Sequence, residues 1–225
     1  MSRQTKLAVA MGLALSMASA ASWADEVGGW YFGVTGGQAK GDVSKADFDE
    51  EVLSAFDLMG APVFSGTSSL DDSDTSFSLF GGYRISEYFS VEAGYVDLGT
   101  EKYRASGLIA PSVPATFSAE FESKGFTAAA IGAVPIGHSF DVHGRAGIYF
   151  ADSEVSGRAT IGSSVGTSSL SANSQDFFYG LGVGMQVGQN WSFSLDWQQF
   201  KDVGDEDKTG ETDVDRLSLG VTYRL

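Results

Sequence analysis

The chain has 225 residues, no cysteine and a formal net charge of −15 at pH 7. The lack of cysteine excludes a fold held by disulfide bonds, and the excess of acidic residues argues against nucleic acid as a partner. Its 29 glycines and 12% aromatic residues favour many short strands over helices. A mean hydropathy near zero excludes a helical membrane protein but suits a β-barrel, in which every second residue faces lipid.

The first residues have the pattern of a secretory signal peptide. Arg3 and Lys6 precede an apolar stretch from Leu7 to Ala18, and small residues follow as far as Ala24. That stretch is shorter than the roughly 20 residues that a membrane helix needs. We therefore predict a cleaved leader at 1–24 and one mature domain at 25–225.

Alternation of large apolar residues with small or polar ones is the main signal in the mature part. In the last segment the apolar face carries Leu217, Leu219, Val221, Tyr223 and Leu225, and the other face carries Ser218, Gly220, Thr222 and Arg224. This period of two is typical of strands with one face in an apolar medium. The same pattern recurs along the chain and predicts strands at 29–39, 75–85, 89–98, 125–134, 140–151, 177–187, 191–200 and 215–225.

The connections between these strands alternate in length. Tight turns are expected at 86–88, 135–139 and 188–190, whereas 40–74, 99–124, 152–176 and 201–214 are long. The segment 152–176 is rich in Ser, Gly and Thr, and we expect it to be mobile or to extend the strands above the membrane. An up-and-down barrel places alternate connections at opposite rims, and outer-membrane barrels have short periplasmic turns and long external loops. The sequence therefore predicts an all-β fold, an eight-stranded antiparallel up-and-down transmembrane β-barrel.

Aromatic residues fall near both ends of the predicted strands. Rings of aromatic side chains at the two membrane interfaces are expected for such a barrel, and the alternative is that they belong to the core of a soluble β protein. The predicted girdle toward the tight turns comprises Trp30, Tyr83, Phe89, Trp191 and Tyr223. The predicted girdle toward the long loops comprises Phe77, Tyr95, Phe126, Phe150, Phe177 and Trp197.

Several segments together resemble the OmpA-like family of eight-stranded transmembrane barrels. They are Trp30-Tyr31-Phe32-Gly33, Val91-Glu92-Ala93-Gly94-Tyr95 with Leu98-Gly99, Gly144-Arg145-Ala146-Gly147, and Leu217 to Leu225. The last segment is similar to the family's closing strand and assembly signal, with Leu225 where an aromatic residue is usual. The resemblance implies a Gram-negative outer-membrane protein.

Two departures limit what the resemblance implies. Members with a peptidoglycan-binding domain continue past the last strand, whereas this sequence ends at Leu225, so no such domain is expected. The best-known member has basic residues pointing inward from its fourth and seventh strands. Ile131 and Ser194 take those positions here, so its gating switch is not carried over.

Charged residues on the inward face are expected to pair with one another. A barrel of eight strands has a lumen that side chains fill, and enclosed charges need partners. We predict an interior charge network and expect Glu92 to lie diagonal to Arg84; the alternative is a narrow ion path. The network comprises Arg84, Glu92, Asp141, Arg145, Asp196 and Arg224.

Catalysis is not expected, nor is a cofactor. Ser139, Asp141 and His143 share a strand face at two-residue steps of roughly 6.6 to 7 Å, which are too long for direct contact between a nucleophile and its base. They also lie near the tight-turn rim, away from outer-leaflet lipid.

The first and last long loops are rich in acidic residues. A solvated acidic face is the simplest interpretation, and the alternative is that the carboxylates gather divalent cations shared with lipid headgroups. No spacing matches a calcium-binding loop. Within the first loop, Val52, Leu53, Phe56, Leu58 and Met59 have helical spacing, which predicts a short helix over the barrel mouth.

The function that best fits the sequence is a structural or surface-interaction barrel. Its expected partners are outer-membrane lipids and lipopolysaccharide, with divalent cations at the loops, and the barrel-assembly machinery, and we expect a monomer. The alternatives are a small-conductance porin-like channel and a soluble ligand carrier with an apolar interior. The small and charged residues of the compact face argue against the carrier, because they fit the inside of a narrow barrel.

Overall fold

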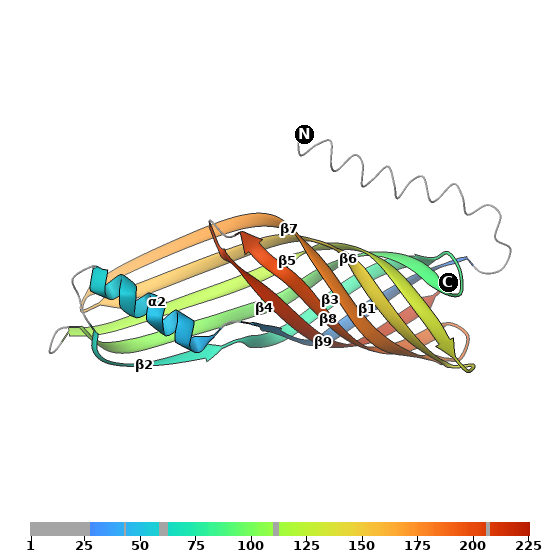
Figure 1. The fold of residues 1–225 in the computed structure, drawn as a ribbon, viewed down its shortest axis with the longest axis horizontal. Coiled ribbons are helices and arrows are strands. Elements are labelled where there is room, and N and C mark those ends of the chain that lie inside the picture. The colour runs from blue at the N-terminus through green and yellow to red at the C-terminus, as the bar shows by residue number, and fades with distance from the viewer. Residues whose placement is uncertain (1–27, 43, 59–62, 110–112, 206–207) are drawn as a thin grey trace, which may run out of the picture.

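The computed structural model describes residues 28–42, 44–58, 63–109, 113–205 and 208–225. The predicted signal peptide at 1–24 lies outside these residues. Within them the chain forms nine strands and one helix (Figure 1). Their bounds are β1 (Gly29–Gly41), α2 (Lys45–Leu58), β2 (Val63–Asp71), β3 (Ser73–Arg84), β4 (Phe89–Ile109), β5 (Val113–Ile136), β6 (Phe140–Ile161), β7 (Ser164–Val187), β8 (Trp191–Asp205) and β9 (Gly210–Arg224).

Eight of these strands close into a ring. β3 to β9 pair with their sequence neighbours in antiparallel register, and β1 joins β3 on one side and β9 on the other. The closure runs through eleven partner pairs, from Tyr31 with Arg224 to Gly41 with Val214. The predicted eight-stranded up-and-down barrel is therefore confirmed.

The ninth strand arises because the second strand of the barrel is interrupted at Asp72. β2 ends at Asp71 and β3 begins at Ser73; β2 pairs with the outer half of β4, and β3 pairs with its inner half. The break faces an irregularity in β4 between Asp97 and Thr100, where Gly99 has a φ of +87°. The Asp74 carboxylate accepts a hydrogen bond from the Thr100 backbone N–H at 2.9 Å, which replaces the interrupted ladder.

The prediction of long loops at 99–124, 152–176 and 201–214 was wrong for most of their length. β4 continues to Ile109 and β5 begins at Val113. In the same way β6 continues to Ile161 and β7 begins at Ser164. For 152–176 a strand extension had been one of two expectations. The result is a tube of strands that projects beyond the barrel proper, seen on the left of Figure 1.

The predicted helix in the first loop is present as α2, although only part of its apolar face is covered. Phe56 is buried and packs with Ile109 and Ala115, and Val52 packs against this cluster. Leu53 and Leu58 are exposed, and Met59 lies outside the described residues. No helix among the described residues has the length and hydropathy needed to cross a membrane.

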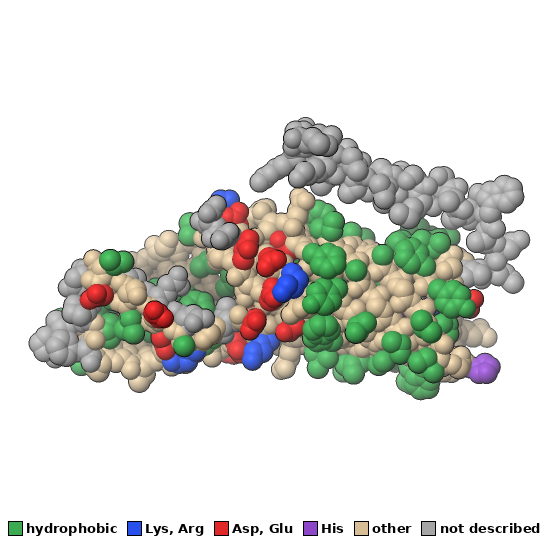
Figure 2. Space-filling model, viewed as in Figure 1, with side chains coloured by type: hydrophobic (Ala, Val, Ile, Leu, Met, Phe, Trp, Pro, Cys, Tyr) green, Lys and Arg blue, Asp and Glu red, His purple; other side chains and the backbone are tan. Residues whose placement is uncertain are grey.

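A belt of apolar side chains surrounds the tight-turn half of the molecule. Figure 2 shows this belt on the right, and charged side chains gather on the part beyond it. Leu219 is 68% exposed and Val183 50% exposed, whereas the Arg145 and Glu92 side chains are only 12% and 11% exposed. Exposed apolar area of this extent marks a membrane-facing surface.

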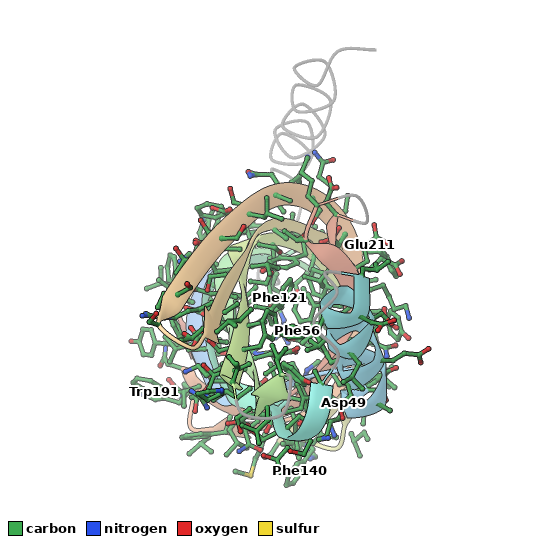
Figure 3. All side chains as sticks on the ribbon, turned by 90° about the vertical axis from the view of Figure 1, so that its left-hand side faces the viewer. Asp49, Phe56, Phe121, Phe140, Trp191 and Glu211 are labelled. Carbon is green, nitrogen blue, oxygen red and sulfur yellow. The ribbon has the colours of Figure 1, made fainter. Side chains whose placement is uncertain are left out.

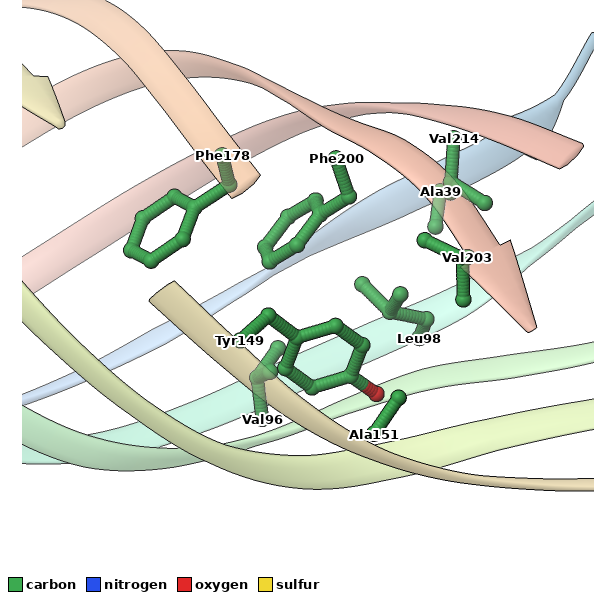
Figure 4. Close-up of a cluster of buried hydrophobic side chains, with 9 residues drawn as sticks. All are labelled: Ala39, Val96, Leu98, Tyr149, Ala151, Phe178, Phe200, Val203 and Val214. Carbon is green, nitrogen blue, oxygen red and sulfur yellow. The ribbon is translucent and has the colours of Figure 1, made fainter. Parts of the chain in front are cut away.

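The interior changes character along the axis. The tight-turn half holds polar and charged side chains, and beyond them lies an apolar plug (Figure 4). Phe178 stacks on Phe200 with ring centroids 5.0 Å apart, and Tyr149 meets Phe200 edge-on at 5.2 Å. The plug comprises Ala39, Val96, Leu98, Tyr149, Ala151, Phe178, Phe200, Val203 and Val214.

Candidate functional site

Arg145 is the centre of the charged layer inside the barrel. It projects from β6 and lies 3.5 Å from the Glu92 carboxylate of β4 and 3.4 Å from the Asp196 carboxylate of β8. The Tyr31 hydroxyl of β1 donates a 3.0 Å hydrogen bond to Glu92. These contacts connect strands that are not neighbours in the sheet, so they fix the cross-section of the barrel.

His143 extends the layer toward the tight turns. Its Nδ1 lies 2.8 Å from the Asp141 carboxylate and its Nε2 lies 2.8 Å from Asp196. The expectation that residues two steps apart on this strand cannot touch was therefore wrong, because the imidazole leans along the strand and shortens the side-chain distance. Ser139 lies in an exposed turn, and the Ser194 hydroxyl donates to Asp196 at 2.6 Å.

Arg216 was missed in the sequence, although it lies on the same face of its strand as Ser218. Only 1% of the residue is exposed. Its guanidinium donates to Ser76 Oγ at 2.8 Å, to Gln198 Oε1 at 2.9 Å and to Thr35 Oγ1. Among the described residues no carboxylate lies within 4.0 Å of it, so neutral oxygens hold this buried cation.

The other two predicted arginines lie at the tight-turn rim. Arg84 is opposite Gly29 and Arg224 is opposite Tyr31 in the register of the sheet. In the register of the sheet Glu92 faces Gly82 and lies diagonal to Arg84, and among the described residues its ion pair is with Arg145. Within the described part of the chain neither rim arginine forms an ion pair, and both are partly accessible to solvent.

The predicted girdle residues all lie on the outward face of the sheet. Trp30 meets Tyr83 edge-on at 5.1 Å, and Trp191 meets Tyr223 in the same way at 4.9 Å. At the other end Tyr95 contacts Phe126 at 5.4 Å. The remaining members, which are exposed or half-buried on the same outer surface, are Phe77, Phe89, Phe150, Phe177 and Trp197.

Packing leaves little space between the Arg216 layer and the apolar plug. A void of about 20 Å³ lies there, lined among others by Glu92, Arg145, Phe178 and Arg216. Such a volume holds about one water molecule. Above it lie the plug residues, which are buried against one another.

Beyond the plug, the projecting strands and α2 line an external chamber of about 1050 Å³ that is open to solvent. Figure 3 looks into the molecule from this end, with Phe56 and Phe121 inside the ring of strands and Trp191 and Phe140 outside it. Its apolar wall carries Phe48, Val52, Phe56, Phe117, Ala119, Phe121, Val155, Ala159 and Ile161. Its charged rim carries Asp42, Glu101, Lys102, Glu120, Asp202, Lys208, Glu211 and Asp213.

Helix α2 is attached to the chamber wall by polar and aromatic contacts. The Tyr103 hydroxyl donates to the Asp49 carboxylate at 2.6 Å, and Phe48 stacks on Tyr103 at 5.2 Å. Lys45 pairs with Asp49 at 2.6 Å. Hydrogen bonds from Lys45, Ser68 and Tyr103 lower the pKa of Asp49 to about 2, so the carboxylate is charged at neutral pH.

Glu101 is the partly buried acid of the chamber. Its carboxylate lies over Gly41 at the end of β1. Burial, with a smaller contribution from the charge of Asp72, raises the pKa of Glu101 to about 7. No group of three or more described His, Asp or Glu residues is placed to hold a metal ion.

The sequence matches the family described as the OmpA-like transmembrane domain over residues 25–225. The outer membrane protein A of Serratia marcescens is 30% identical over 153 residues, which cover 65% of this chain and 38% of that protein. The outer membrane protein A of Klebsiella pneumoniae is 30% identical over 149 residues, which cover 65% and 40%. The chain thus spans about two fifths of the length of these relatives.

Two solved structures with a similar course of the backbone come from other outer-membrane proteins. Neisserial surface protein A has a TM-score of 0.45 at 17% identity, covering 87% of this chain and 97% of that chain. The outer membrane protein OprG from Pseudomonas aeruginosa has a TM-score of 0.46 at 15% identity, covering 88% and 96%.

The family match spans the segment from which the ring of strands and its apolar belt are built. With the sequence relatives, it identifies the chain as a Gram-negative outer-membrane protein. The protein therefore belongs to the OmpA-like transmembrane domain family.

Proposed function

We propose that the protein is a non-conducting surface barrel, which is anchored in the outer membrane and meets its partners through the projecting strands and chamber. The observation that carries this proposal is the apolar plug across the lumen. Ions cross a membrane protein only along a polar, hydrated path. The plug residues are buried against one another, and the void beneath them holds about one water molecule.

Planar-bilayer recordings of the purified chain test the proposal. The unmodified protein is expected to give no stepwise conductance. A double variant, Tyr149→Ala with Phe200→Ala, removes two of the three aromatic rings of the plug and is expected to give measurable steps. The matched control is Phe126→Ala, which removes an outward ring and leaves the plug intact.

A narrow channel is the second candidate, because the tight-turn half of the lumen is lined by charged groups around Arg145. Stepwise conductance of the unmodified protein that changes in the Arg145→Met variant would favour this channel and overturn the closed barrel. We propose no catalytic step for the charged groups.

The surroundings of the barrel suggest its lipid partners. Ion pairs such as Lys40 with Asp72 and Lys124 with Glu122 lie where the strands leave the apolar belt. Lysines at this level suit the phosphates of lipids and lipopolysaccharide, and divalent cations would bridge the carboxylates to the same phosphates. Chelation with EDTA is then expected to increase hydrogen exchange in β2 and β8, and unchanged exchange argues against the bridge.

The outward apolar face of β9 suits recognition by the barrel-assembly machinery. Leu217, Leu219, Val221 and Tyr223 of β9, with Leu225 directly after it, point outward, and the Leu225 backbone N–H donates to Trp30 O at 3.0 Å. We propose that this segment is the assembly signal and that the closed barrel is a monomer. Light scattering of the detergent-solubilised protein tests the second point.

A further inference from the structure

We propose that the external chamber binds a small amphipathic cation, an organic molecule with an apolar body and a protonated amine or guanidinium group. The inference rests on the proposed function, because the closed plug forms the inner end of the chamber. It names the class of ligand that the external site takes.

The size and wall of the chamber suit an apolar molecular body. About 1050 Å³ lies at the upper end of the range of sites that hold drug-sized ligands. Phe117, Phe121 and Val155 line it from β5 and β6 and stay partly accessible to solvent. Covering such apolar surface is favourable by roughly 25 cal/mol per Å².

The rim of the chamber has an excess of negative charge. Six acidic residues stand against Lys102 and Lys208 on this rim. Lys201 pairs with Asp213 and Lys208 pairs with Asp205. Within the described residues, no cationic side chain lies within 4.0 Å of Asp42, Glu101 or Glu211, so these carboxylates are free to pair with a ligand.

Glu101 places one of these carboxylates close to the apolar wall. It lies on the same face of β4 as Tyr103, and both line the chamber. A charge pair formed beside apolar side chains is stronger than one formed in open water. A ligand with an apolar body and a cationic group would contact the apolar wall and pair with the Glu101 carboxylate. An anion would be repelled by the acidic rim, and a neutral molecule would leave Glu101 unpaired.

A binding experiment with two fluorescent probes of similar size tests the proposal. The full chain in phosphatidylcholine nanodiscs is titrated at pH 8, above the pKa of Glu101. The two probes are ethidium, an aromatic cation, and 1-anilinonaphthalene-8-sulfonate, an aromatic anion. Empty nanodiscs give the blank. Ethidium is expected to bind at least about tenfold more tightly than the anion, which corresponds to roughly 1.4 kcal/mol.

Three variants locate the site. Glu101→Gln is expected to weaken ethidium binding by about tenfold, and Ala159→Trp, which fills the chamber, is expected to abolish binding. Glu154→Gln on the outward face of β6 is the matched control and should bind as the unmodified protein does. Heat-modifiable gel mobility confirms that each variant is folded before it is titrated.

The inference is overturned by equal binding of the two probes, by equal effects of the two Glu→Gln changes, or by unchanged binding in Ala159→Trp. Bilayer recordings separate its failure from that of the proposed function. A protein that gives no conductance and binds no ethidium refutes the ligand class alone. A wild-type protein that conducts refutes the closed barrel as well.

Discussion

The Tyr103 hydroxyl donates a 2.6 Å hydrogen bond to the Asp49 carboxylate, and this contact ties helix α2 to the chamber wall. Tyr103 is almost fully buried, so its hydroxyl has no easy replacement partner in water. The helix is otherwise attached to the wall by the stacking of Phe48 on Tyr103 and by the small apolar cluster around Phe56. The position of α2 therefore depends on a few contacts that can be removed singly.

Tyr103→Phe is expected to weaken the docking of α2 without affecting the barrel. Loss of a hydrogen bond to a charged acceptor costs about 1.5 to 3 kcal/mol. Amide hydrogen exchange in α2 should therefore accelerate by more than tenfold, while exchange in β1 and β9 stays the same. Tyr88→Phe, which removes an exposed hydroxyl at the other end, is the control, and equal exchange in both variants contradicts the role of this bond.

Glu101 is expected to make the protein less stable as the pH rises through neutrality. Its pKa is raised to about 7 in the folded protein, so the protonated form is favoured by folding. That stabilisation is complete below about pH 4.5 and is lost as the pH rises through about 7. After discounting for partial exposure, the change is on the order of 2 kcal/mol.

The measurement is denaturant unfolding of the unmodified protein and Glu101→Gln at pH 4 and pH 8. The unmodified protein should lose more stability over this interval than the variant does. Glu154→Gln should follow the unmodified protein, because its side chain points outward. Parallel loss in all three proteins would remove Glu101 as the cause.

Arg145→Met is expected to destabilise the barrel strongly. The substitution leaves Glu92 and Asp196 without their shared cation inside the lumen. Breaking a buried ion pair in this way costs about 3 to 5 kcal/mol. Urea unfolding in lipid vesicles measures the loss, and Arg158→Met on the outward face of the same strand should change stability by less than about 0.5 kcal/mol.

Leu219→Arg is expected to destabilise the protein in a bilayer because the side chain faces lipid. A charged residue near the membrane centre of a barrel costs about 2 to 4 kcal/mol. Leu170→Arg introduces the same charge on an exposed position of β7 outside the apolar belt and should have little effect. Equal stability of the two variants would mean that the apolar belt is not in hydrocarbon.

The part of the fold inside the membrane could be predicted from the sequence, because lipid imposes a period of two on every strand. The projecting strands could not, since the apolar residues change face at the membrane boundary. In β5 apolar residues occupy even positions such as Phe126 and odd positions such as Phe121 farther out. In β4 the irregularity at Gly99 turns the odd positions from the outer to the inner face, so the pattern no longer indicates one continuous strand.

The candidate site was predictable only in part, for a related reason. Alternation identifies which residues point inward, and it placed Arg145, Glu92 and Asp196 there. It does not say which inward residues meet across the lumen, because that depends on ring closure and on side-chain rotamers. The contact of Arg216 with Thr35 joins residues far apart in sequence, and the external chamber requires the position of α2, which no periodicity supplies.

The hydrogen-bonded register of the outer hairpins limits how the surface of this protein can diversify. β6 and β7 pair without interruption from the membrane to Ile161 and Ser164. A single inserted residue in such a ladder would exchange the wall of the chamber with the outer surface of the molecule. Natural length variants of these hairpins should therefore differ by two residues per strand. Otherwise they should carry a compensating β-bulge that keeps the chamber-lining residues on the inner face.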